Sequence, residues 1–199
     1  MKAQCSSLRM ALTLVAISIW SGTMIVLTYN LTAPLIAKNQ DTLIREAALE
    51  VCPNAVRINP VLDSASGVRF FLAWDKDSSL AGVAMEADGK GFGDRVRVLY
   101  AYNPSIQCII GFKVVESKET PGIGDRISSD SSFLANFQNL DITHPLVAVK
   151  HGHKSQPWEI DGISGATISS KAVAKLLQAS VETRLPVVQH YWEVHHAAP

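Results

Sequence analysis

The residues with the clearest chemical potential lie together in one segment, residues 161–170 (DGISGATISS). Four hydroxyl side chains and two glycines occur there, and an amphipathic run of residues follows directly. Small polar residues before such a run are typical of a helix N-terminus, where Ser164, Thr167 or Ser169 could cap the first turn. On this interpretation the glycines only turn the chain.

The same segment allows a chemical interpretation. A helix N-terminus presents unpaired N–H groups and a partial positive charge, which suit a phosphate group. Gly165 lets the backbone approach such a group closely, and Ala166 adds little bulk. The hydroxyl of Thr167 could then hold a phosphate covalently through an ester. Composition and spacing alone leave both the helix cap and the phosphate site open.

Two further turns precede this segment. Residues 119–125 (ETPGIGD) contain Pro121-Gly122, which predicts a tight turn with the glycine at positive φ. Residues 91–93 (GFG) precede a run of β-branched and aromatic residues, which predicts a turn leading into a strand. Taken alone, each turn has a purely structural explanation.

In combination, the segments resemble the FMN-binding domains found in the G subunits of Rnf-type complexes and in the C subunits of Na⁺-translocating NADH:quinone reductases. The flavinylation motif of that family reads Asp, two variable positions, Ser or Thr, Gly, Ala, Thr. The residues that match it are Asp161, Ser164, Gly165, Ala166 and Thr167. Residues 119–125 resemble the family's ETPGLGD segment, at a similar distance before the motif.

The resemblance implies the cofactor and its site. Thr167 would carry FMN through a phosphoester bond, and no residue would be catalytic. The other residues expected at the flavin are Asp161, Ser164, Gly165, Ala166, Glu119, Thr120, Pro121 and Gly122. Family members carry Gly-Tyr-x-Gly where this chain has residues 91–93, but Asp94-Arg95-Val96 replaces the usual small residue and hydrophobe. The role of Phe92 therefore stays open.

The resemblance also implies a function. The chain would be an electron-transfer subunit of a membrane-bound, ion-translocating complex that links ferredoxin and NAD, without turnover of its own. Its partners would be the other subunits and a Mg²⁺-dependent flavin transferase that uses FAD, because a threonine hydroxyl is a poor nucleophile and no histidine lies near Thr167 in sequence. Two alternatives remain: the same domain in a Na⁺-translocating NADH:quinone reductase or another membrane redox system, and an anchored scaffold without flavin.

The N-terminal part of the chain predicts a membrane anchor. No charged residue occurs between Arg9 and Lys38, and the most apolar part of this run is long enough to span a bilayer as a helix. A cleaved signal peptide would need a shorter apolar region and a cleavage site of small residues. Lys2 and Arg9 precede the span, so the N-terminus is expected in the cytoplasm of a bacterial cell and the rest on the periplasmic side of the inner membrane.

Composition excludes other classes of function. Lysine and arginine together equal aspartate and glutamate at 18 each, and no basic stripe is present, so nucleic-acid binding is not expected. Cys5, Cys52 and Cys108 are too widely separated for a haem or iron–sulfur site, and the last two could form a disulfide or remain free thiols. The histidines lack converging carboxylate or cysteine ligands, so no metal site is expected at His151 and His153 or at His190, His195 and His196.

The remaining pattern predicts an α+β fold, with an antiparallel sheet and flanking helices in a single extracytoplasmic domain on one N-terminal transmembrane helix. Strands are expected over residues 68–74, 80–87, 96–102 and 106–116, the last two forming a hairpin with a bulge near Gly111. Helices are expected over residues 41–51, 130–140 and 169–184, with Asp130 or Ser131 as a cap and Pro186 just past the last one.

These elements give the expected domain organisation. Pro34 is expected to kink or end the membrane helix. The expected parts are a cytoplasmic N-terminus (1–9), a transmembrane helix (10–30), a juxtamembrane helix and linker (31–60), an FMN-binding domain (61–185) and a C-terminal tail (186–199).

Overall fold

The computed structural model describes residues 2–63 and 66–196, and describes side chains over residues 8–63 and 66–194. The chain divides into two compact units, Met1–Leu43 and Ile44–Pro199. The first unit consists of most of one long helix. The second contains the sheet, the remaining helices and the last turns of that long helix.

The long helix α1 runs from Lys2 to Val51 and contains Pro34 in its interior. Its apolar residues before Leu43 are largely exposed, and from Leu8 onward it is long and apolar enough to cross a membrane. Of the two alternatives for Pro34, an end of the membrane helix was wrong, because α1 continues through this residue into the expected juxtamembrane helix. A proline removes one backbone donor, but the hydrogen bonds of the turns on both sides remain.

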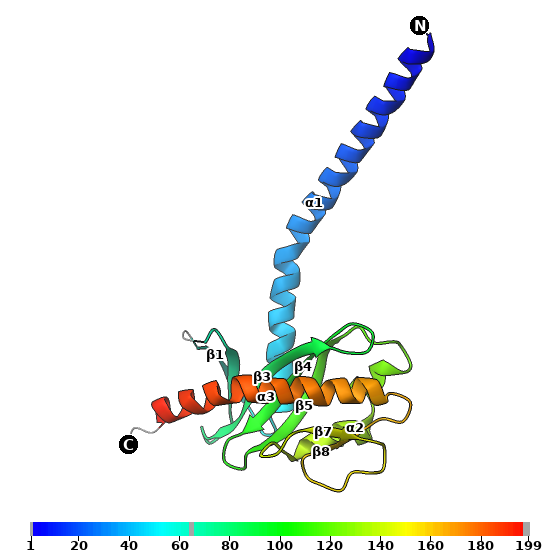
Figure 1. Cartoon of the computed structure of the whole chain (residues 1–199). Helices are drawn as coiled ribbons and strands as arrows, with labels where there is room; N and C mark the ends of the chain where they lie inside the picture. The colour runs from blue at the N-terminus through cyan, green and yellow to red at the C-terminus, as the bar shows by residue number, and fades with distance from the viewer. Residues whose placement is uncertain (1, 64–65, 197–199) are drawn as a thin grey trace. The chain divides into compact units, whose positions relative to one another are not determined.

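A six-stranded antiparallel sheet forms the centre of the second unit (Figure 1). Its strands follow one another in the sheet in chain order. They are β1 (Arg57–Leu62), β2 (Arg69–Trp74), β3 (Leu80–Lys90), β4 (Arg95–Asn103), β5 (Cys108–Ser117) and β6 (Leu140–Asp141). The four predicted strands are β2 to β5, and the predicted hairpin is the β4–β5 pair.

Strand β1 was not predicted, and it contains Pro60. Proline cannot donate to a sheet ladder and is confined to edges and bulges. β1 is an edge strand and pairs only with β2 in the sheet order. The predicted bulge is present in the β4–β5 pair, where the register shifts between Ala101 and Tyr102, opposite Gly111.

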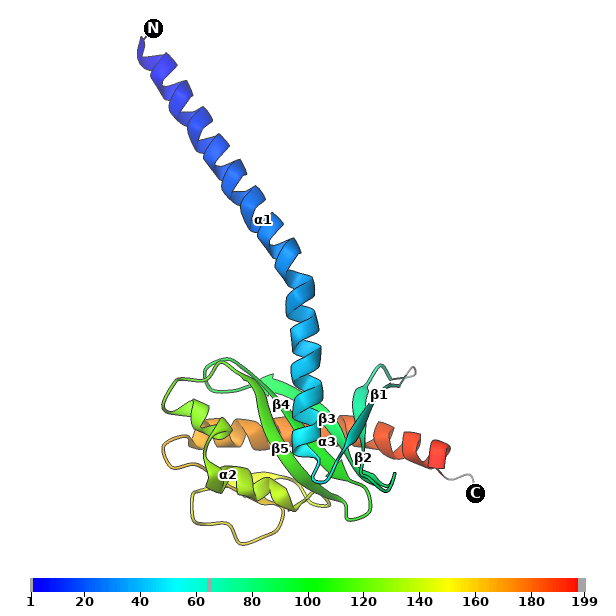
Figure 2. The same ribbon diagram turned by 180° about the vertical axis from the view of Figure 1, so that it is seen from behind.

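Each face of the sheet is covered by a different helix (Figures 1 and 2). The last turns of α1 pack Ala47, Ala48 and Val51 against one face, where Phe71 and Leu99 are buried. A Cβ at Gly111 would overlap the carbonyl group of Val51, so only glycine allows the helix end to approach β5 this closely. The opposite face packs against α3 and contributes most of the apolar core.

Helix α3 runs from Thr167 to His196 and lies across the strands (Figure 1). The Tyr100 hydroxyl on β4 and the Ser180 hydroxyl on α3 form a buried 2.9 Å hydrogen bond between helix and sheet. Burial raises the pKa of Tyr100 to about 12, so its hydroxyl stays protonated.

The prediction that this helix ends before Pro186, with a tail after it, was wrong. Pro186 lies inside α3, and Val188 beyond it is 2% exposed in the core. The ring of Tyr191 packs edge-on against Phe70 at 5.2 Å between ring centroids. These apolar contacts stabilise the helix past the hydrogen bond that the proline removes.

The part of the chain between β5 and α3 is mostly short elements. Gly124–Ser128 (η1) and Asn136–Gln138 (η2) are 3₁₀ helices, and α2 (Ser131–Ala135) is a short α-helix. The predicted cap is confirmed, because the Asp130 carboxylate accepts a hydrogen bond from the Phe133 amide at 3.2 Å. A parallel pair, β7 (Val147–Val149) and β8 (Glu159–Asp161), leads into α3. The α+β fold with an antiparallel sheet is confirmed.

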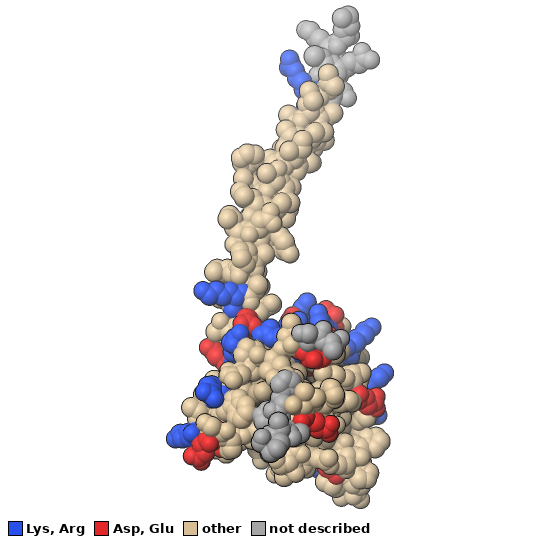
Figure 3. Space-filling view, turned by 90° about the vertical axis from the view of Figure 1, so that its left-hand side faces the viewer, with Lys and Arg blue, Asp and Glu red and all other residues tan. Residues whose placement is uncertain are grey.

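The surface of this unit carries charges of both signs (Figure 3), and its two cysteines are not bonded to each other. Figure 3 shows acidic and basic residues interspersed over the face that it displays. Cys52 and Cys108 are both free thiols, so the disulfide alternative is not realised. Burial raises the pKa of the Cys52 thiol to about 12, which keeps it protonated and unreactive. The side chain of Cys5 lies outside the described residues.

Candidate functional site

Thr167 is the first residue of α3, two residues before the expected start of the helix at residue 169. Strand β8 ends at Asp161, and a tight turn joins it to the helix, closed by a hydrogen bond from the Ala166 amide to the Ile163 carbonyl at 3.0 Å. Gly165 has φ +83°, a conformation that side chains disfavour. No atom lies within 4 Å of the position where its Cβ would be, so the backbone at this turn faces open space.

The hydroxyl groups of this segment are in different environments. Ser170 is fully buried, and its Oγ accepts from the Ile163 amide and donates to the Ala166 carbonyl, both at 3.0 Å. Ser169 is also buried and donates to a carboxylate oxygen of Glu119 at 2.9 Å. Thr167 is partly exposed, and its hydroxyl has no hydrogen-bond partner among the described residues. It is therefore available for reaction at the end of the helix.

Glu119 connects three segments that are distant in sequence. Its Oε1 accepts from the backbone amides of Phe92 at 2.6 Å and Gly93 at 3.3 Å, while its Oε2 accepts from Ser169. A Cβ at either Gly91 or Gly124 would overlap its carboxylate oxygens. The turns at residues 91–93 and 119–124 therefore pack beside the first turn of α3.

The turn at residues 120–124 has the predicted form. The amides of Ile123 and Gly124 donate to the Thr120 carbonyl at 3.2 and 3.0 Å, and Gly122 has φ +80°. Pro121 and Gly122 are exposed, and no atom lies within 4 Å of a Cβ built at Gly122. This turn presents exposed backbone beside the helix start.

Three large apolar side chains are exposed in these segments. Phe92, Ile123 and Ile168 are 59%, 56% and 60% exposed, respectively. Each belongs to a segment that contains Glu119 or contacts it. The structure thus combines a free hydroxyl, a helix N-terminus and exposed apolar side chains in one region of the surface.

Asp161 lies in the motif, but its carboxylate faces another segment. Its Oδ1 accepts from the Gly152 amide at 2.7 Å, and its Oδ2 lies 3.4 Å from Nδ1 of His151. The Asn136 side chain accepts from the Asp161 amide at 3.0 Å and donates to its carbonyl at 3.1 Å. Asp161 therefore fixes the strand that leads into the motif, at a position before the helix start.

Comparison with known proteins identifies the family. The profile of the FMN-binding domain matches residues 91–182. The chain is 32% identical to the G subunit of the proton-translocating ferredoxin:NAD(+) oxidoreductase complex of Clostridium ljungdahlii, over 81% of this chain and 83% of that protein. It belongs to the FMN-binding-domain family of Rnf-type G subunits.

A second curated protein and a solved structure are also similar to this chain. The G subunit of the ion-translocating oxidoreductase complex of Methanosarcina acetivorans is 28% identical over 87% of this chain and 92% of that protein. The crystal structure of the C subunit of the Na(+)-translocating NADH-quinone reductase from Parabacteroides distasonis has the same fold, with a TM-score of 0.58 over 73% of this chain and 92% of that one, at 22% identity.

One residue that holds the loop before α3, Arg126, was not identified from the sequence. Arg126 donates from Nη1 to the Ser164 carbonyl at 3.2 Å and from Nη2 to the Asp130 carboxylate at 2.8 Å. The Ser132 hydroxyl, the Phe133 amide and this guanidinium hold the pKa of Asp130 below its usual range. Arg126 follows residues 119–125 directly in the sequence, but no motif connects it with residues 161–170. Its contact with Ser164 is therefore seen only in the folded chain.

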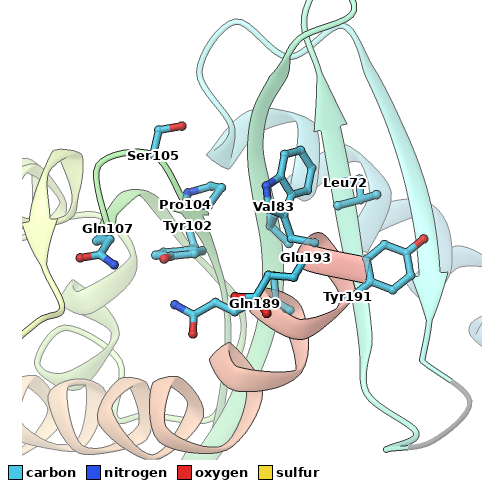
Figure 4. A pocket seen from close by; sticks show the side chains of 11 residues that line it. Leu72, Val83, Tyr102, Pro104, Ser105, Gln107, Gln189, Tyr191 and Glu193 are labelled. Atoms are coloured by element: carbon cyan, nitrogen blue, oxygen red, sulfur yellow. The ribbon is translucent and has the colours of Figure 1, made fainter. Parts of the chain in front are cut away.

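A pocket of about 360 Å³ lies elsewhere in the domain (Figure 4). Figure 4 shows Gln189 and Tyr191 of α3 facing Tyr102 and Leu72 of the sheet. Val188 at this pocket is about 30 Å further along α3 than Thr167, at about 1.5 Å per residue. The pocket therefore belongs to the other end of the helix and is separate from residues 161–170.

The described residues contain no group of three or more His, Cys, Asp or Glu side chains placed to hold a metal ion. His151 instead contacts the Gly162 carbonyl through Nδ1 at 3.1 Å. The side chains of His195 and His196 lie outside the described part of the chain.

Proposed function

We propose that this chain is the flavoprotein subunit of a membrane-bound, ion-translocating oxidoreductase complex of the Rnf type, and that it carries FMN on Thr167 through a phosphoester bond. Membership of the G-subunit family supports the complex and the cofactor. The observation that carries the attachment site is the free, partly exposed hydroxyl of Thr167 at the first residue of α3.

The residues around Thr167 fit a phosphate group. The first turn of a helix has N–H groups without intrahelical acceptors and a partial positive charge. The open space beside Gly165 lets the phosphate approach the backbone. Arg126 fixes the loop through the Ser164 carbonyl and adds a positive charge close to it. Lys171, four residues after Thr167, is exposed on the same face of the helix.

The flavin ring would lie against the exposed apolar side chains beside the helix start. Phe92, Ile123 and Ile168 supply apolar surface, and Thr120, Pro121 and Gly122 supply exposed backbone. Bound FMN would supply one- and two-electron redox chemistry. The chain's contribution is to hold the ring in one place and limit its contact with water.

Attachment requires a separate flavin transferase. Among the described residues, the Thr167 hydroxyl has no hydrogen-bonded base that could remove its proton, and the Asp161 carboxylate faces Gly152 and His151. In the proposed step Thr167 Oγ1 attacks the phosphorus on the FMN side of FAD. A new P–O bond forms, the diphosphate bond breaks, AMP leaves, and the transferase accepts the hydroxyl proton. Mg²⁺ held by the transferase would neutralise the diphosphate.

The proposed location in the membrane rests on the apolar part of α1 and on the basic residues at its N-terminal end. The apolar part of α1 would span a bacterial inner membrane, with Lys2 and Arg9 on the cytoplasmic side and the FMN-binding domain on the periplasmic side. Electrons would enter and leave through neighbouring subunits, and the ester would prevent loss of the flavin. A role in a Na⁺-translocating NADH:quinone reductase or another membrane redox system is the second candidate, favoured by the shared fold.

In-gel fluorescence tests the attachment. The full chain is expressed with and without a flavin transferase, denatured on a gel and viewed under ultraviolet light. We expect a fluorescent band only with the transferase, and its loss in Thr167→Val, while the control Thr183→Val, at an exposed threonine further along α3, retains the signal. A dark wild-type band contradicts covalent flavin and favours a scaffold. Equal fluorescence in Thr167→Val moves the attachment site elsewhere.

A further inference from the structure

Glu119 is a buried acidic side chain, only 7% exposed, in a region where neighbouring residues are exposed. Transfer of a carboxylate from water to the protein interior costs free energy unless hydrogen bonds replace those of water. Three donors do so here: the amides of Phe92 and Gly93 at Oε1 and the Ser169 hydroxyl at Oε2. Both oxygens are therefore directed at donors of the protein itself.

The surrounding backbone is shaped to admit this carboxylate. At Gly91 and at Gly124 a Cβ would overlap one of its two oxygens, and at Gly124 it would also lie 3.0 Å from Ser169 Oγ. Any other residue at these two positions would displace Glu119 or the turn that it holds. Two glycines and three donors converging on one side chain indicate a built site for the carboxylate.

Among the residues whose side chains the structure describes, Glu119 forms no ion pair with a lysine, arginine or histidine. Its hydrogen bonds come only from neutral N–H and O–H groups. A negative charge without such an ion pair thus lies behind the first turn of α3, two residues along the helix from Thr167 at its contact with Ser169.

We infer that Glu119 is a positioning residue: its carboxylate fastens the turn at residues 91–93 to the first turn of α3 and places one negative charge beside the Thr167 site. It acts through the Phe92 amide and Ser169 rather than by binding the flavin. The inference rests on the proposed attachment at Thr167. The loss of the carboxylate would release Phe92 and the helix start together, whereas loss of its charge alone would change the electrostatic potential at the flavin.

Amide hydrogen exchange tests the connection without any flavin. In the full-length chain prepared in detergent without the transferase, we expect the Phe92 and Gly93 amides to be protected. In Glu119→Ala their exchange should accelerate at least about 10-fold, because each such factor corresponds to about 1.4 kcal/mol, the scale of a hydrogen bond to a charged group. Ser169→Ala, which leaves Oε1 in place, should change these two amides less. Unchanged exchange in Glu119→Ala would overturn the inference.

The flavin-loaded chain tests the charge. Glu119→Gln retains the size of the side chain and an acceptor for both amides, so it should be flavinylated like the wild type. The midpoint potential of its FMN should shift to a higher value, because a nearby negative charge disfavours added electrons. Glu116→Gln, a half-buried glutamate on β5, serves as the control and should shift the potential less.

The outcomes separate this inference from the proposed function. An FMN potential in Glu119→Gln equal to that of the wild type contradicts the role of the charge. Wild-type flavinylation in Glu119→Ala contradicts the positioning role. A wild-type chain that carries no flavin contradicts the proposed function, and the exchange of the Phe92 and Gly93 amides then still decides whether Glu119 holds the turn. If Glu119→Ala does not fold, Ser169→Ala, which keeps the carboxylate, should fold with a lowered melting temperature and show reduced flavinylation. Wild-type flavinylation in Ser169→Ala would then contradict the positioning role.

Discussion

At the residue scale, hydroxyl groups within one helical turn have distinct roles. Ser170 uses its hydroxyl twice, as an acceptor for the Ile163 amide and as a donor to the Ala166 carbonyl, and so closes the loop that leads into α3. Ser169 faces Glu119. Thr167, at the start of the same turn, leaves its hydroxyl without a partner among the described residues. All three side chains carry a hydroxyl group, and their different positions around the helix give each hydroxyl a different environment.

Ser170→Ala should destabilise the domain. The substitution leaves the Ile163 amide buried without its acceptor, which costs about 1–3 kcal/mol in the free energy of unfolding. Urea denaturation measures the difference. Ser164→Ala, at an exposed position, is the matched control and should change stability by less than about 0.5 kcal/mol. Equal stability of Ser170→Ala and the wild type would contradict the role given to the hydroxyl.

Cys52 should make the fold sensitive to alkaline pH. Its pKa rises from 9.0 to about 12 on burial, so the unfolded chain loses this proton first. The stabilising contribution is complete below pH 9 and is lost as the pH rises towards 12. Tyr100, raised from 10.0 to about 12, acts in the same direction. The free energy of unfolding should therefore decrease between about pH 8 and about pH 10.5, and should decrease less in Cys52→Ala. Parallel decreases in both proteins would contradict this assignment.

At the element scale, helix α3 connects the candidate site to the core. Its first turn presents Thr167, and its middle packs on the sheet through Ser180 and Tyr100. Its last turns add Val188 and Tyr191 to the core beyond Pro186. Because one helix both presents Thr167 and packs on the sheet, its contacts far from Thr167 contribute to the position of the proposed attachment site.

Val188→Ala should lower stability by about 2 kcal/mol, because a fully buried valine contributes roughly 1.5–3 kcal/mol. Val194→Ala, on the same helix but 59% exposed, should be nearly neutral. Thermal denaturation of both variants measures the difference. If the two variants melt at the same temperature, the part of α3 after Pro186 does not contribute to the core.

At the scale of the whole molecule, the division of the chain falls inside α1. Residues up to Leu43 belong to the first unit, while Ile44, Ala47, Ala48 and Val51 belong to the second and bury one face of its sheet. The domain therefore begins at Ile44, earlier in the sequence than its first strand, which begins at Arg57.

Two truncations test this boundary. A chain of residues 44–199 should fold cooperatively and remain soluble, because it retains both helices that cover the sheet. A chain of residues 53–199 lacks the helix end that covers Phe71 and Leu99, and should aggregate or unfold. Circular dichroism melting and gel filtration distinguish them. Equal behaviour of the two chains would contradict the assignment of residues 44–51 to the domain.

Much of the fold follows from local patterns in the sequence. Runs rich in β-branched and aromatic residues, separated by turn signals, predicted β2 to β5, and the N-terminal apolar run predicted a helix long enough to cross a membrane. Both are short-range signals that need no knowledge of distant residues. The predictions were less successful at prolines: the edge strand that contains Pro60 was not predicted, and α1 and α3 continue through Pro34 and Pro186, where a helix end had been expected or left open. The preference of proline for helix ends is a local effect. The contacts that outweigh it in α3, those of Val188 and Tyr191 with the core, involve residues distant in sequence.

The candidate site divides in the same way. The sequence by itself determined the helix start at Thr167, the glycine turn at Gly122 and, through resemblance, the family and its cofactor. Only the tertiary structure decided that Thr167 has a free hydroxyl, that Asp161 faces Gly152, and that Glu119 joins residues 91–93 to Ser169. Those contacts join residues up to 50 positions apart, and their geometry depends on how α3 packs across the sheet, which no local pattern of residues encodes.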